Sequence, residues 1–142
     1  MSYTERFTEG WAYLGGINPA SYNTVQDTGN LLCEEYARLA IIVHAGVMGG
    51  NCGFDIEEAT TSVAGTRAQF DSGNKDLDLV ATTDDNTVSV IEIKAEEFTV
   101  GTYSYINVEC TPAAASIFSV QVWGGEARHK PVSTTTLDSV TD

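Results

Sequence analysis

The feature that most restricts the fold of this chain is a series of short segments in which apolar and polar residues alternate. The strongest segment covers residues 36–48, YARLAIIVHAGVM, and follows a period of two. One face of the expected strand carries Ala37, Leu39, Ile41, Val43, Ala45 and Val47, and the other carries Tyr36, Arg38, Ala40, Ile42, His44 and Met48. Side chains that alternate in this way point to opposite faces of a β-strand. The sequence therefore predicts a strand with one wholly apolar face.

A helical start is the alternative for this segment, because residues 34–40 would also suit a helix. Two features favour the strand: the β-branched run at residues 41–43, and the four glycines that follow between residues 46 and 53. Branched side chains pack well on a pleated surface, and glycines mark the end of a regular element. We expect His44 to be a structural residue of this strand.

Six further segments show short-strand patterns with turn-forming residues between them, at residues 53–59, 66–70, 76–83, 87–94, 103–111 and 116–125. Asp84 and Asp85 are expected in a turn, and residues 95–98 could form one helical turn. Nothing suggests a strand–helix–strand unit. Strands that recur in this way predict an all-β fold, an antiparallel β-sandwich or jelly-roll-like domain.

The two ends of the chain lack this pattern. Residues 1–30 are rich in aromatic and turn-forming residues without strand or helix periodicity, and predict an extended N-terminal arm. The sandwich domain is expected over residues 31–132, and residues 133–142 read as a short polar C-terminal tail. Because disordered segments are poor in aromatic residues, the arm should be buried against its own domain or a neighbour.

Charge and cysteine content exclude several classes of function. The chain of 142 residues carries a formal net charge of −13, so phosphate contacts with nucleic acid or an anionic membrane are disfavoured. Three widely spaced cysteines and two histidines do not make a zinc site, and fit buried thiols in a reducing cytoplasm. We find no signal peptide pattern and no membrane-spanning run.

No group of residues predicts catalysis. The sequence lacks a nucleophile elbow, a phosphate-binding glycine loop and an HExxH motif. The acidic loop at residues 71–78 has oxygens that suit calcium, but Gly73 and Lys75 stand where ligands would be needed, and turn chemistry explains it better. We expect no enzymatic activity, no metal and no cofactor.

Several segments together resemble a family of small structural proteins of tailed bacteriophages and prophages. They are NPASYNTVQDTGNLLCEEYARLAIIVHAGVMGG, ATTDDNTVSVIEIKAEEF, YSYINVECT and SVQVWGGEARHKPV. The resemblance runs from Asn18 to Val132 and consists of strand and turn patterns, not catalytic signatures. It implies a virion protein, a capsid decoration or cement protein that binds the outside of the head shell and is made in the host bacterial cytoplasm.

The resemblance implies the major capsid protein as partner, and a homo-oligomer, with a trimer slightly favoured over a dimer. We expect the arm to carry most of the capsid affinity through its apolar residues Phe7, Trp11, Tyr13 and Leu14. We expect the basic cluster before the tail to contact an acidic neighbouring surface through Arg128, His129 and Lys130. We also expect a protein without residues 1–17 to fold. The alternative is a carbohydrate- or receptor-binding β-sandwich module, with Trp11, Trp123, Tyr103 or Tyr105 stacking on sugar rings.

Overall fold

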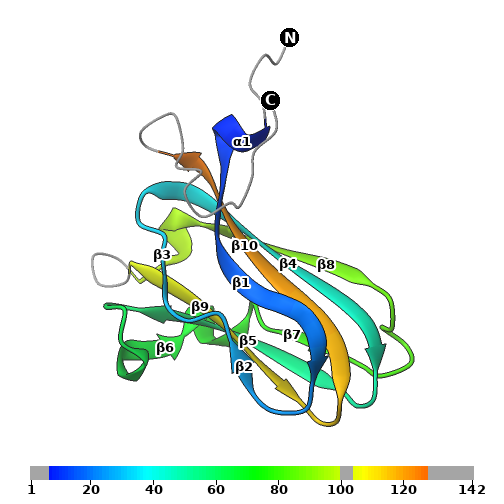
Figure 1. Cartoon of the computed structure of the whole chain (residues 1–142). Helices are drawn as coiled ribbons and strands as arrows, with labels where there is room; N and C mark the ends of the chain where they lie inside the picture. Colours follow the sequence, from blue (N-terminus) through cyan, green and yellow to red (C-terminus); the bar gives the residue numbers. More distant parts are fainter. Residues whose placement is uncertain (1–6, 100–103, 128–142) are drawn as a thin grey trace.

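Two antiparallel sheets face each other in the computed structural model, which describes residues 7–99 and 104–127 (Figure 1). The four-stranded sheet has the order β1-β10-β4-β8, with strands β1 (Trp11–Tyr22), β10 (Ser116–Ala127), β4 (Tyr36–Met48) and β8 (Val88–Lys94). The six-stranded sheet contains β2 (Gln26–Asp27), β9 (Tyr105–Pro112), β5 (Cys52–Ala59) and β6 (Arg67–Gln69), while β3 (Leu31–Leu32) pairs with β9 and β7 (Leu77–Leu79) pairs with β5. The prediction of an all-β sandwich is confirmed.

In the described part of the chain, helical segments are confined to single turns. They are α1 (Phe7–Gly10) and the 3-10 turns η1 (Ala64–Thr66), η2 (Phe70–Gly73) and η3 (Ala95–Glu97). The turn expected at residues 95–98 corresponds to η3, which directly follows β8. No helix in the part of the chain that the structure describes is long and apolar enough to cross a membrane.

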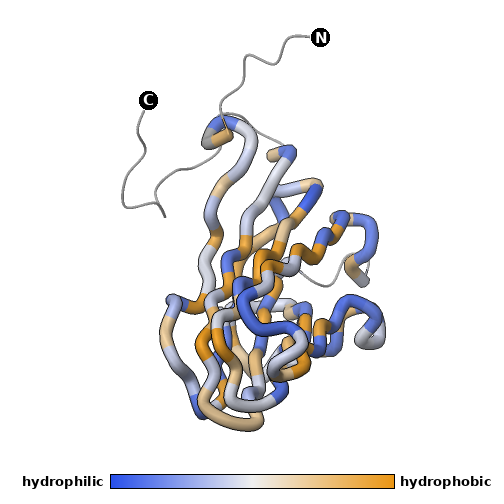
Figure 2. The backbone as a smooth tube through the Cα atoms, turned by 90° about the vertical axis from the view of Figure 1, so that its right-hand side faces the viewer, coloured by the Kyte–Doolittle hydropathy of each residue, from blue (hydrophilic) through white to orange (hydrophobic). Residues whose placement is uncertain are grey.

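The core lies between the sheets, where the apolar residues of both inner faces meet. Figure 2 shows the resulting change between hydrophobic and hydrophilic residues along the strands. Phe118 of β10 contacts Phe54 of β5 with ring centroids 5.4 Å apart, so the central strands of the two sheets pack directly on each other. The largest fully buried side chains are Phe54, Phe70, Phe118, Ile41, Ile56, Ile93, Ile106, Val43, Val108, Val120, Val122 and Asn107.

The predicted strand over residues 36–48 is confirmed as β4, and its alternation holds in the middle. It fails at both ends, where Tyr36 and Met48 belong to the core and Val47 is 59% exposed. The register explains the Met48 end, because β4 advances three residues from Ala45 to Met48 while β10 covers two, from Phe118 to Ser116. Such a β-bulge shifts the following side chains to the other face.

The expected arm over residues 1–30 is wrong for most of the part that is described. Trp11–Tyr22 forms β1, an edge strand that pairs with β10, and its Ala12 and Ile17 lie in the core. Period two is hidden in β1 because the pairing shifts register after Tyr13 and after Ile17. The sandwich therefore begins well before residue 31, and deleting residues 1–17 would remove half of a sheet strand. The tail predicted at residues 133–142 lies outside the described residues.

Candidate binding surface

Four aromatic side chains gather on the outer face of the four-stranded sheet, and we call them the aromatic cluster: Phe7, Trp11, Tyr13 and Trp123. The register of β1 and β10 places Trp11 opposite Gly125 and Tyr13 opposite Trp123. Ring centroids lie 5.3 Å apart for Tyr13 and Trp123, 5.2 Å for Phe7 and Trp123, and 6.4 Å for Phe7 and Trp11. The cluster stays partly open to solvent, with Phe7 60% exposed.

Glycine is needed where Trp11 lies on the sheet. A Cβ atom at Gly125 would lie 2.8 Å from the Trp11 ring, closer than side-chain atoms approach each other. The ring therefore rests directly on the backbone of β10. Trp123 is also fixed, because its Nε1–H donates a hydrogen bond to Gln121 Oε1 at 3.0 Å. The cluster is held in place before any partner binds.

The structure brings together three of the residues expected to bind a partner, Phe7, Trp11 and Tyr13. Leu14 is different, because its side chain packs against the core. Arg128, His129 and Lys130 lie outside the described residues. Trp123 is named by sequence reasoning in the sugar-binding alternative and not among the capsid-binding residues, although the sequence Trp-Gly-Gly is a signal for aromatic packing over a bare backbone.

Toward the free edge of the sheet, this outer face carries both apolar and polar residues. Ile42 lies between Gln121 of β10 and Val90 of β8, and His44 lies between Ser119 and Val88. Val88 and Val90 are 59% and 57% exposed. We refer to the aromatic cluster with Ile42, Val88 and Val90 as the apolar face. His44 is an exposed residue of this face, as its assignment to a structural strand predicts.

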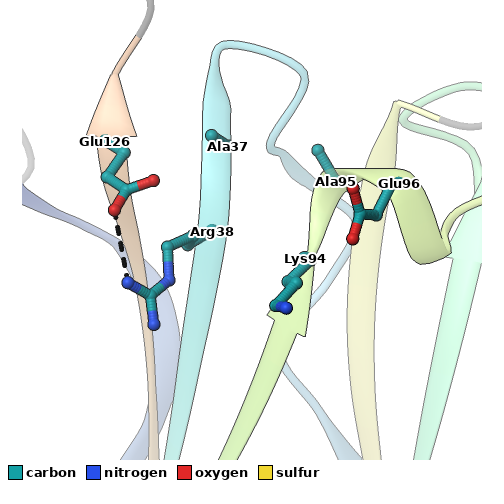
Figure 3. Close-up of a pocket in the computed structure, with 6 residues that line it drawn as sticks. All are labelled: Ala37, Arg38, Lys94, Ala95, Glu96 and Glu126. Carbon is teal, nitrogen blue, oxygen red and sulfur yellow. Dashed lines mark hydrogen bonds and ion pairs between the residues drawn. The ribbon is translucent and has the colours of Figure 1, made fainter.

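A shallow depression of about 580 Å³ lies at the end of the sheet where β10 and β8 finish (Figure 3). Its lining comes from Ala37, Arg38, Lys94, Ala95, Glu96 and Glu126. Arg38 pairs with Glu126 at 3.2 Å and approaches Glu92 at 4.0 Å. Arg38 of β4 therefore links the carboxylates of Glu126 on β10 and Glu92 on β8 at this end of the sheet.

The outer face of the six-stranded sheet is acidic. The register places Asp27, Glu109 and Asp55 in one row across β2, β9 and β5. Burial raises the pKa of the Asp55 and Glu109 carboxyls, and neighbouring carboxylates raise it further. Arg67 offsets part of this repulsion through ion pairs with Asp27 at 3.3 Å and Glu57 at 3.8 Å. One outer face of the sandwich thus carries the aromatic cluster and exposed valines, and the other carries a row of carboxylates.

The acidic loops have structural roles. Asp76 accepts hydrogen bonds from the Ile56 N–H at 2.9 Å and from Gln69 Nε2 at 2.7 Å. Asp84 and Asp85 lie in a turn, as predicted, and accept backbone N–H groups of Val80 and Met48. Among residues 7–99 and 104–127, no group of three or more His, Cys, Asp or Glu is arranged to hold a metal ion.

The sequence matches no protein-family model and no curated protein. Among solved structures, the chain is similar to one from cowpea mosaic virus empty particles, with 6% identity, a TM-score of 0.48 and 94% of each chain covered. It is similar to the tobacco streak virus coat protein at 10% identity and a TM-score of 0.39, over 97% of this chain and 100% of that one. A Clostridium thermocellum xylanase shares 10% identity at a TM-score of 0.44, over 89% of this chain and 28% of that one. Likeness at this level concerns the fold and carries no function.

Proposed function

We propose that this protein is a virion structural protein that works by binding, as a decoration or cement protein on the outside of a tailed-bacteriophage head shell. The observation that carries the proposal is the apolar face, where the aromatic cluster and the exposed Val88 and Val90 lie on the same side of the four-stranded sheet. Exposed apolar surface on a folded domain is typical of a protein interaction site. The resemblance in strand and turn patterns supports the choice of a phage capsid as the partner.

The aromatic cluster can supply much of the binding energy. Fully burying one large apolar side chain contributes about 2 kcal/mol. The Trp11 ring already rests on the backbone at Gly125, and the Trp123 side chain is hydrogen-bonded to Gln121. Little side-chain freedom therefore remains to be lost on binding. Two or three such rings seated on the major capsid protein would shift affinity by a few orders of magnitude. The proposed contact is therefore a sheet face and not an extended arm.

The acidic face suits the side that points away from the shell. A strongly acidic surface keeps a protein soluble and is repelled by packaged nucleic acid. With the apolar face on the capsid, the row of Asp27, Glu109 and Asp55 on the opposite sheet would face solvent. A closed homo-oligomer, a trimer slightly before a dimer, would multiply weak contacts through effective concentration.

The test uses purified capsids that lack the protein, mixed with the full chain and separated by sedimentation. The double variant Phe7→Ala/Trp123→Ala should bind at least about tenfold more weakly, which corresponds to 1.4 kcal/mol or more. Val63→Ala is the matched control, because Val63 is 64% exposed and lies outside the apolar face. Unchanged decoration by the double variant would refute the proposed contact.

A carbohydrate-binding module is the second candidate function, and substitution of Trp123 distinguishes it from capsid binding. A sugar ring stacks on an open aromatic face. Trp11 already lies against the Gly125 backbone and stacks with Phe7 at an interplanar angle of 11°, which favours protein contact. Glycan binding by the isolated protein that is lost in Trp123→Ala would support the carbohydrate module instead.

A further inference from the structure

β8 lies at the edge of the four-stranded sheet, and one half of its outer edge is covered by other described residues (Figure 1). The Glu92 carbonyl accepts a hydrogen bond from Lys75 Nζ at 3.0 Å, and the Lys94 N–H donates to Glu97 Oε2 at 2.7 Å. These backbone groups are therefore not used by the pairing with β4. Lys75 and Glu97 protect the Glu92–Lys94 half of the edge from other strands.

The other half of the edge, Val88–Val90, is open within the described part of the chain. Backbone groups of alternate residues point to the same edge of an antiparallel strand, so Val88 and Val90 turn their N–H and C=O groups outward, as Glu92 and Lys94 do. No described residue forms a hydrogen bond with these groups of the two valines, whose side chains are 59% and 57% exposed. Natural sheets protect their edges with charges, prolines, bulges or a covering segment, so an open apolar edge is suited to accept another strand.

We propose that this open edge pairs with the same edge of a second copy of the chain. A two-fold axis through Ser89 places Val88 of each copy opposite Val90 of the other. Both residues point their backbone groups to the edge, so the members of each pair exchange N–H to C=O hydrogen bonds in both directions. Their side chains meet as apolar cross-strand pairs on the outer face of the joined sheets. The contact is self-complementary, as a two-fold interface requires.

The shape of β8 limits the pairing to the open residues. In the two-fold register, Glu92, whose carbonyl is covered by Lys75, faces Asn86 of the second copy. The chain leaves the edge at Asn86, where φ is 57° and the N–H donates to the Gly46 carbonyl at 3.0 Å. The second copy therefore turns away before it reaches the covered part of the edge. A longer peptide strand would continue along the edge and meet Lys75, so β8 itself fits better.

Charge permits this contact even though each chain has a formal net charge of −13. Glu92 is the one carboxylate of β8. In the two-fold register the Glu92 residues of the two copies lie about 20 Å apart along the strands, beyond the screening length of about 8 Å at physiological salt. The β4 residues beside the contact, Ile42 and His44, carry no negative charge. The contact favours a dimer over a trimer for the free protein and does not depend on the capsid role.

Amide hydrogen exchange of the full chain at two protein concentrations tests the pairing. A contact of this size is weak, so the concentrations compared are about 0.02 mM and about 1 mM. The Val88 and Val90 amides should exchange at least about threefold more slowly at the higher concentration, because a paired amide exchanges only when the pairing opens. The Ser89 and Ile91 amides point toward β4 and should exchange at the same rate at both concentrations.

Two substitutions at Val90 should remove the concentration dependence. Val90→Pro lacks the outward N–H but keeps the β4 hydrogen bonds of its neighbours. Val90→Lys keeps the N–H and places a charge on the edge, a device by which natural edge strands avoid pairing. The control Val63→Lys, at a residue that is 64% exposed and lies outside β8, should keep the concentration dependence. Slower exchange of the Val88 amide at high concentration in both Val90 variants would overturn the proposal.

Cysteine cross-linking tests the register. Val88→Cys and Val90→Cys are made as separate proteins, and each is oxidised with glutathione disulfide alone and in an equal mixture; the native thiols are buried. Residues of a hydrogen-bonded pair have Cα atoms about 5.5 Å apart, within the range of a disulfide. The mixture should give at least about threefold more linked dimer than either protein alone, or than Val88→Cys mixed with Val63→Cys.

Two results would overturn the proposal besides those named for the variants. Exchange of the Val88 and Val90 amides that is equal at both concentrations, whether fast or slow, would show that no second copy covers the edge. Linkage of Val90→Cys mainly to itself would show that the copies meet in a different register.

Discussion

Two adjacent glycines of β10 support aromatic rings of very different freedom. A Cβ atom at Gly124 would lie 2.5 Å from Cγ of Tyr36, whose ring belongs to the core, whereas a Cβ atom at Gly125 would lie 2.8 Å from Trp11 on the outer face. The same substitution, glycine to alanine, therefore meets a confined ring at one position and a partly exposed ring at the next.

Gly124→Ala should lower the free energy of unfolding by about 1–3 kcal/mol, because an overpacked core side chain cannot leave its place. Gly125→Ala should cost about 1 kcal/mol or less, since the partly exposed Trp11 ring can move toward solvent and loses only contacts on the outer face, with β10 and with Phe7. At both positions the gain in strand stability of alanine over glycine offsets about 0.5–1 kcal/mol. Gly125→Ala should also shift tryptophan emission to longer wavelength.

Urea denaturation followed by circular dichroism measures both costs, in the natural chain and in a Tyr36→Ala background. The cost of Gly124→Ala should disappear when the Tyr36 ring is absent, which is the coupling expected of residues in direct contact. The reasoning is wrong if Gly124→Ala costs the same in both backgrounds, or if it costs no more than Gly125→Ala.

Three further outcomes follow from burial and charge. Phe118 is 1% exposed, so Phe118→Ala should lower the free energy of unfolding by about 3–5 kcal/mol. The control Ile117→Ala, at the exposed neighbouring residue, should change the free energy of unfolding by less than about 0.5 kcal/mol. Equal effects of the two substitutions would contradict the packing. Because the folded-state pKa of Glu109 is raised, its charge destabilises the fold above that pKa, so Glu109→Gln should add about 0.2–1 kcal/mol at pH 7. This gain should vanish as the pH falls through the folded pKa to below about 4.3, and a gain independent of pH would count against the charge repulsion. Burial raises the pKa of Cys33 to about 12 and also raises that of Cys110, so a disulfide reagent should modify no thiol at pH 8 until denaturant is added; early labelling would contradict the buried sites.

The strands with regular alternation could be predicted from the sequence, and β4, β8 and β10 appear where period two indicates them. β1 could not, because Gly15, Gly16 and Pro19 accompany two register shifts that break the pattern. A register shift also explains why the face predicted for Val47 is wrong. Val47 lies in the bulge between Ala45 and Met48, which depends on the pairing with β10 and not on the sequence of β4 alone.

The surfaces were predictable only in part. Phe7, Trp11 and Tyr13 are close in sequence and could be recognised as a group of aromatic residues without a place in a regular element. Their contact with Trp123 depends on the register between the first and last long strands, which local sequence does not reveal. The acidic row has the same origin, since Asp27, Glu109 and Asp55 meet only through cross-strand pairing.

The position of β10 between β1 and β4 also determines when this protein can fold during its synthesis. β1 and β4 do not pair with each other, so the four-stranded sheet cannot close until Ala127 has left the ribosome. Until then the inner sides of both strands remain open to solvent and to other nascent chains. Contacts between residues so far apart in the chain also form slowly. A pause in translation before Ala127 should therefore favour aggregation, and a chaperone that holds the incomplete chain should increase the yield of folded protein.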